Sequence, residues 1–126
     1  MQMIEANGIT FAVSVDGPAD GPVVTLSNSL ATDHHMWDGQ MPALTDRYRV
    51  VRYDRRGHGR SDAPAGPYTI EMLVEDARQI LAALGITKTH WCGLSLGGMV
   101  GQRIATLHPE LIDKLVLCDT SARMAP

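Results

Sequence analysis

The chain has 126 residues, which is enough for one domain with one buried core and too few for two. Hydrophobic residues make up 44% and charged residues 20%, with no low-complexity segment, and this composition excludes disordered and fibrous proteins. Eleven Lys and Arg against fourteen Asp and Glu give a formal net charge of −3, and no basic cluster is longer than Arg55-Arg56, which argues against nucleic acid and anionic membranes as partners.

The N-terminal segment lacks the basic and then apolar regions of a signal peptide. The longest apolar runs, such as residues 80–84, fall far short of the roughly 20 residues that a membrane span requires. We therefore expect a cytoplasmic location.

Two short β-branched segments open the chain, at residues 10–15 and 23–26, and the Gly, Pro and Asp residues between them are typical of a turn. This pattern predicts two strands joined as a hairpin. A short helix is predicted for residues 37–44, and the alternation over residues 48–53 predicts a further strand.

A glycine-punctuated loop over residues 54–61 precedes the clearest helix of the sequence. Apolar residues recur at steps of three and four through residues 70–84, with charged and amide residues between them. Thr69 is a suitable N-cap and Gly85 a suitable residue just past the C-terminus. The spacing predicts an amphipathic helix with both ends defined.

The rest of the chain alternates between strand and helix patterns. A strand over residues 87–92 leads into a second helix, which Pro109 stops just after Leu107, and a strand follows within residues 111–118. Alternation of this kind predicts an α/β fold with a mostly parallel sheet of about six strands and right-handed crossovers.

Cys92 and Cys118 both fall within predicted strands and lack the C-x-x-C spacing of a metal or redox pair. We expect two buried free thiols, because free cysteine behaves as a small apolar residue. A disulfide between them is the alternative.

A candidate catalytic motif lies between the predicted strand and the second helix. Gly93, Ser95 and Gly97 form the pattern G-x-S-x-G in the strand-to-helix context that gives the pattern its meaning. A sharp turn there holds the serine hydroxyl clear of its neighbours, and the two glycines meet the steric demand of the turn. The N–H of Leu96, at the start of the helix, is a natural donor to an oxyanion. The alternative is a tight structural turn or a phosphate-binding loop, although neither a Walker nor a G-x-G-x-x-G pattern is present.

Four motifs in order, spread over the whole chain, resemble the α/β-hydrolase fold family, and within it 3-oxoadipate enol-lactonases and their esterase and cofactor-free haloperoxidase relatives. These motifs are Asn28-Ser29-Leu30 with Trp37 downstream, residues 53–61, residues 93–98 and residues 115–120. The resemblance implies Ser95 as nucleophile, backbone N–H groups of Leu30 and Leu96 as oxyanion hole, a small ester or lactone as substrate, and neither metal nor organic cofactor. It also implies that Asp54 and Arg56 form a structural ion pair.

The same resemblance implies that the catalytic Asp and His follow later strands, and that a helical cap begins near residues 124–126. We interpret the five histidines of this chain as structural, and a base role for His34 or His35 as the remaining alternative; the five are His34, His35, His58, His90 and His108.

The chain then corresponds to the N-terminal part of one α/β-hydrolase domain, without the cap and the last two strands. It would act as a serine hydrolase only with a complementary C-terminal chain that supplies Asp and His. The alternatives are a non-catalytic interaction module and a haloperoxidase or perhydrolase. Because residues 115–118 would form an exposed apolar edge, we also expect the chain alone to form homo-oligomers or aggregates.

Overall fold

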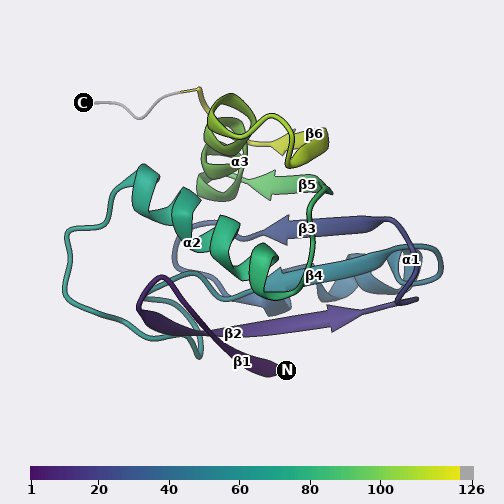
Figure 1. Ribbon diagram of the computed structural model, residues 1–126, viewed down its shortest axis with the longest axis horizontal. Coiled ribbons are helices and arrows are strands. Elements are labelled where there is room, and N and C mark those ends of the chain that lie inside the picture. The colour runs from purple at the N-terminus through teal and green to yellow at the C-terminus, as the bar shows by residue number, and fades with distance from the viewer. Residues whose placement is uncertain (123–126) are drawn as a thin grey trace.

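The computed structural model describes residues 1–122, and Figure 1 shows a single sheet with helices on both of its faces. The strands are β1 (Gln2–Ala6), β2 (Ile9–Asp16), β3 (Val23–Ser27), β4 (Arg49–Tyr53), β5 (Thr89–Leu94) and β6 (Ile112–Cys118). The helices are the 3-10 helix η1 (His34–Gln40), α1 (Met41–Leu44), α2 (Ile70–Ala83) and α3 (Leu96–Leu107).

The six strands lie in the order β1-β2-β4-β3-β5-β6. Strand β3 pairs in parallel with β4 and β5, and β5 pairs in parallel with β6, whereas β1 and β2 are antiparallel additions at one edge. The predicted α/β fold with a mostly parallel sheet is therefore confirmed.

The predicted hairpin between residues 10–15 and 23–26 is wrong. Strand β2 pairs with β1 and β4, and β4 separates it from β3. The hairpin partner of β2 is β1, joined through Asn7-Gly8, whose φ angles of 47° and 81° are those of a tight turn that matches strand twist. Strand β1 was not predicted from the sequence, although the Asn7-Gly8 dipeptide follows its last residue.

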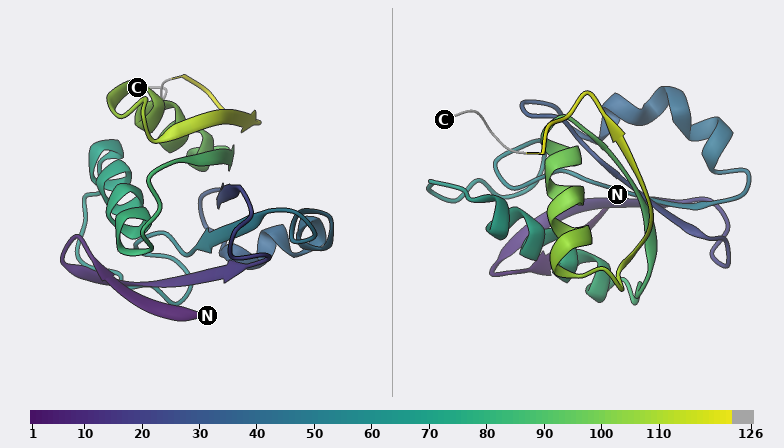
Figure 2. Two further views of the ribbon diagram at one scale, coloured as in Figure 1. Left: turned by 45° about the vertical axis from the view of Figure 1, so that its right-hand side comes forward. Right: turned by 90° about the horizontal axis from the view of Figure 1, so that it is seen from above.

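The helices form two unequal layers around the sheet, as the turned views of Figure 2 show. Helices α2 and α3 pack on one face over the larger core, whereas η1 and α1 lie on the other face over a smaller one. The largest fully buried side chains of the first core are Phe11, Trp91, Ile80, Leu81 and Ile104. The second consists of Val24, Leu26, Trp37, Met41 and Val50.

Helix α2 has the two ends that its sequence predicts. The hydroxyl of Thr69 accepts a hydrogen bond from the N–H of Met72 at 3.1 Å. At the other end Gly85 has a φ of 73°, and the N–H groups of Gly85 and Ile86 donate to the carbonyls of Ala82 and Leu81. These two bonds form a Schellman motif, which satisfies carbonyls that the helix leaves free.

Arg56 has a different partner from the one expected. Its guanidinium forms two hydrogen bonds of 2.6 Å with the buried carboxylate of Asp76 in α2, rather than an ion pair with Asp54. Asp54 instead accepts from the backbone N–H groups of His34 and Arg60. The expected Asp54–Arg56 pair is therefore wrong, because the loop turns these two side chains, which are two residues apart, toward different elements.

Strand β6 forms one edge of the sheet within residues 1–122. Its side chains Val116 and Leu117 are 53% and 43% exposed, which is unusual for a run of apolar residues in a strand. On the η1 side, an apolar groove of about 530 Å³ extends from Trp37 and Leu44 across β5 to Val116. This end of the sheet is thus left with uncovered apolar surface.

The cysteines of β5 and β6 are free, as expected, but only partly buried. Burial and the neighbouring thiol of Cys118 raise the pKa of Cys92 to about 11. Cys92 is therefore a protonated thiol near neutral pH and a poor nucleophile. No helix within residues 1–122 has the length and apolar character needed to cross a bilayer.

Candidate active site

Ser95 lies on the turn that joins β5 to α3, with φ 53° and ψ −113°. A positive φ is costly for a residue with a Cβ, so the surrounding structure must hold it. The N–H of Ser95 donates to the carbonyl of Cys118 at 2.9 Å, and the hydroxyl of Thr120 donates to the Ser95 carbonyl at 2.6 Å. The residue itself is exposed, so its hydroxyl is accessible on a fixed backbone.

The two glycines of the motif lie at places where chain contacts chain. A Cβ on Gly93 would overlap the backbone of Gly97, and a Cβ on Gly97 would overlap the backbone carbonyl of Ser27 in β3. The indole N–H of the buried Trp91 also donates to the Gly97 carbonyl at 3.0 Å. Helix α3 can begin directly against the sheet because neither glycine has a side chain.

The segment that follows β3 brings Leu30 to the same place. Its first residue, Asn28, is 2% exposed and is held on both sides: its amide donates to the Tyr53 carbonyl at 3.0 Å and accepts from the Trp37 indole at 2.8 Å. The side chain of Leu30 is 64% exposed, and Ala31 has a φ of 61°. The Asn28–Trp37 contact could not be read from the sequence, because both residues are individually ordinary.

Two backbone N–H groups near Ser95 are available to a ligand. Leu96 is the first residue of α3, so its N–H belongs to the turn that has no acceptor within the helix. The N–H of Leu30 has no acceptor among the residues that the structure describes. Donors of this kind at a helix start favour negative charge.

Ser95, Leu30 and Leu96 line one cavity of about 460 Å³ together with His58 and Tyr68. Gly93 and Gly97 lie on either side of Ser95, in β5 and α3, and do not line the cavity. The larger apolar groove beside β6 includes none of the five candidate residues. The structure therefore brings the exposed serine and two free N–H groups to a single cavity of mainly apolar walls.

None of the histidines in the described part of the chain forms a hydrogen bond with Ser95. His34 is buried, and its Nδ1 lies 2.9 Å from the carboxylate of Asp54. Burial opposes the charge of Asp54, but hydrogen bonds from the Arg60 N–H and from His34 outweigh it and hold the pKa of Asp54 below its ordinary value. His34 is thus engaged in the scaffold, which does not favour the alternative of a base at this position.

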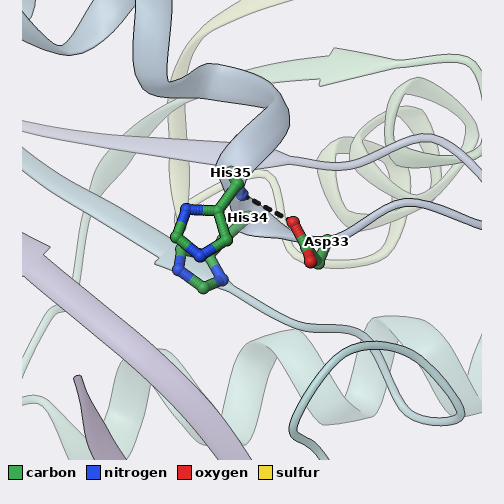
Figure 3. A group of neighbouring side chains, drawn as sticks. All are labelled: Asp33, His34 and His35. Carbon is green, nitrogen blue, oxygen red and sulfur yellow. Dashed lines mark hydrogen bonds between the residues drawn. The ribbon is translucent and has the colours of Figure 1, made fainter.

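Asp33, His34 and His35 place their side-chain nitrogen and oxygen atoms within 4.8 Å of one another, a grouping that resembles a metal site (Figure 3). Each group already has a protein partner, however. Asp33 accepts the N–H of His35 at 2.9 Å and caps η1, as Figure 3 shows, while the His35 ring lies 3.2 Å from Asp38. The capping of η1 accounts for this arrangement.

The remaining histidines lie apart from the cavity, with one exception. His90 and His108 lie 3.8 Å and 3.7 Å from exposed carboxylates at the other end of the strands. His58 does line the cavity, but both of its ring nitrogens contact backbone groups. The described residues therefore bring an exposed serine and two free backbone N–H groups together, and none of their histidines hydrogen-bonds Ser95.

Residues 22–126 match the family model described as the alpha/beta hydrolase fold. The match covers most of the chain, and the chain belongs to this family. The resemblance seen in the sequence motifs is thereby confirmed.

Among curated relatives, 3-oxoadipate enol-lactonase 1 of Acinetobacter baylyi is 40% identical over 117 residues, which make up 93% of this chain and 44% of the relative. A protein of Caulobacter segnis, whose name proposes carbamate hydrolysis, is 39% identical over 122 residues, or 95% of this chain and 46% of that relative.

Solved structures of hydrolases superpose closely on this chain, in agreement with the family assignment. A hydrolase from Pseudomonas aeruginosa PA01 superposes with a TM-score of 0.96 at 48% identity, over 99% of this chain and 48% of that one. The enol-lactonase from Burkholderia xenovorans LB400 gives a TM-score of 0.96 at 43% identity, over 98% and 48%. The chain spans about half the length of the relatives that it matches.

Proposed function

We propose that residues 1–126 form the N-terminal part of a single α/β-hydrolase domain that cleaves small carboxylic esters or lactones through an acyl-enzyme. One observation carries this proposal: the exposed Ser95 hydroxyl, on a strained turn, shares a cavity with the free N–H groups of Leu30 and Leu96. The lactonase relatives support a lactone or ester as the substrate class.

In the proposed reaction, the Oγ of Ser95 attacks the substrate carbonyl while a base removes the hydroxyl proton. The carbonyl oxygen becomes an oxyanion, and the N–H groups of Leu30 and Leu96 donate to it. The tetrahedral species then expels the alkoxide, which takes the proton from the base. Water, activated by the same base, attacks the acyl carbonyl and restores the serine. Neither a metal nor an organic cofactor takes part in these steps.

The base and its carboxylate partner are proposed to come from a complementary C-terminal part, because residues 1–122 offer none at Ser95. The open edge of β6 and the apolar groove beside it support such a partner. An unpaired strand edge offers N–H and C=O groups to a further strand, and an apolar groove gains free energy when it is covered.

A serine-reactive phosphonate tests the role of Ser95. We expect it to add one group to the complete hydrolase, located at Ser95 by peptide mass spectrometry, because only a serine held in an oxyanion site reacts fast with such reagents. Prior incubation with an ester substrate should slow the labelling. Labelling at another residue, or equally fast labelling after denaturation, would contradict the assignment.

Sedimentation of the isolated 126-residue chain tests the proposed partner. We expect dimers or larger species, since Val116 and Leu117 remain exposed on an unpaired edge. Adding the complementary half should convert these into one species with the mass of a 1:1 complex and ester hydrolase activity. A monodisperse monomer of 13.7 kDa that turns over ester without the other half is the opposite result and would refute the proposal.

A further inference from the structure

The direction of a backbone donor is set by the peptide that contains it. The N–H of Leu30 belongs to the same planar trans peptide as the carbonyl of Ser29, so the two groups point in opposite directions. That carbonyl accepts from the hydroxyl of Thr32 at 2.8 Å and from the guanidinium of Arg55 at 3.4 Å. Two donors on one side of the peptide thus fix the side to which the Leu30 N–H points.

The next peptide, between Leu30 and Ala31, is held by a histidine. The N–H of Ala31 donates to Nε2 of His58 at 2.9 Å, and Ala31 adopts a φ of 61°. This conformation is costly for alanine, so it persists because of contacts such as this one. Both peptides that flank Leu30 are therefore restrained by residues outside the segment.

The protonation of His58 follows from its two partners. Its Nδ1 lies 3.1 Å from the carbonyl of Arg56, which can only accept, so Nδ1 carries the proton. Nε2 is then the free acceptor that the Ala31 N–H requires. The ring is neutral in this arrangement, with one tautomer selected by two backbone groups.

We propose that His58 is a positioning residue for the oxyanion hole: by accepting the Ala31 N–H it fixes the peptides around Leu30, and so the direction of the Leu30 N–H. The proposal rests on the proposed function, in which this N–H stabilises the oxyanion. His58 acts through the backbone and transfers no proton. It also joins the loop after β4 to the segment after β3, so two distant parts of the chain form one side of the cavity.

Two substitutions separate this role from simple packing. In the complete hydrolase, His58→Leu removes the acceptor, and we expect kcat to fall about 10- to 100-fold while KM changes less than about twofold. This loss is somewhat smaller than that from deleting an oxyanion donor outright, because the N–H remains but is misdirected. His58→Gln places a carbonyl oxygen near the position of Nε2, and we expect it to restore most of kcat.

The matched control is His108→Leu, which changes a histidine at the end of α3 that lies outside the cavity and should leave kcat unaltered. Unchanged kcat in His58→Leu, an effect confined to KM, or an equal loss of kcat in the Gln variant would each overturn the proposal.

Nitrogen-15 NMR of the unmodified protein is a measurement that needs no variant. It should show His58 with the proton on Nδ1, and a proton on Nε2 instead would refute the proposal. If Ser95→Ala kept full activity, the proposed function would fail while the NMR result still stood, so the two failures are distinguishable.

Discussion

Replacing Ser95 by alanine is expected to lower kcat of the complete hydrolase by at least about 10⁴-fold, with little effect on folding. The hydroxyl is the group that forms the acyl bond in the proposed reaction, and the other hydroxyls of the cavity, those of Tyr68 and Thr69, are hydrogen-bonded to Pro64 and Met72. Alanine fits the same backbone conformation about as well as serine, so the turn should survive. Steady-state hydrolysis of an ester, with circular dichroism of both proteins, measures the two effects.

The matched control for this experiment is Ser14→Ala, which removes a hydroxyl from β2 whose one hydrogen-bond partner within residues 1–122 is Asp16. It should leave kcat within about twofold, since surface substitutions have small effects. If the Ser95→Ala protein kept substantial turnover and still formed the covalent phosphonate adduct, Ser95 would not be the nucleophile.

Replacing Gly97 by alanine is expected to lower the free energy of unfolding by more than about 2 kcal/mol, and replacement by valine by more. The new Cβ would overlap the backbone carbonyl of Ser27, which belongs to β3 and cannot rotate away as a side chain could. Either β3 or the start of α3 must move: Leu96 of the cavity lies at the start of α3, and Leu30 of the cavity follows β3. Activity should therefore fall together with stability.

Urea unfolding of the complete hydrolase measures this effect, with Gly39→Ala as the matched control. A Cβ at Gly39 meets no atom within 4 Å, so that variant should unfold within about 0.5 kcal/mol of the original protein. If the Gly97 and Gly39 variants proved equally stable, the close contact beneath the turn would not be the constraint described here.

Local patterns predicted the parts of the fold that depend on neighbouring residues. The apolar period and the caps at Thr69 and Gly85 predicted helix α2. The glycines two residues to either side of Ser95 predicted the turn. The α/β class followed from the alternation of such segments.

Pairings between distant residues could not be predicted in the same way. The partner of β2 is β4 rather than β3, and nothing within either segment distinguishes the two. Arg56 bonds to Asp76 and not to Asp54, two residues away, for a similar reason, since the direction of each side chain depends on how the loop lies over α2. The contacts that hold the candidate oxyanion segment, from His58 and Trp37, are likewise visible only in three dimensions.

Residue 30 contributes to the proposed site through its peptide N–H, while its side chain is largely exposed at the rim of the same cavity. Every amino acid except proline carries that N–H, so nineteen residue types can occupy the position without loss of the donor. The side chain is then free to change in size and polarity as different substrates are selected. During evolution, substitutions at residue 30 can therefore change the substrate preference without changing the donor that the chemical step requires.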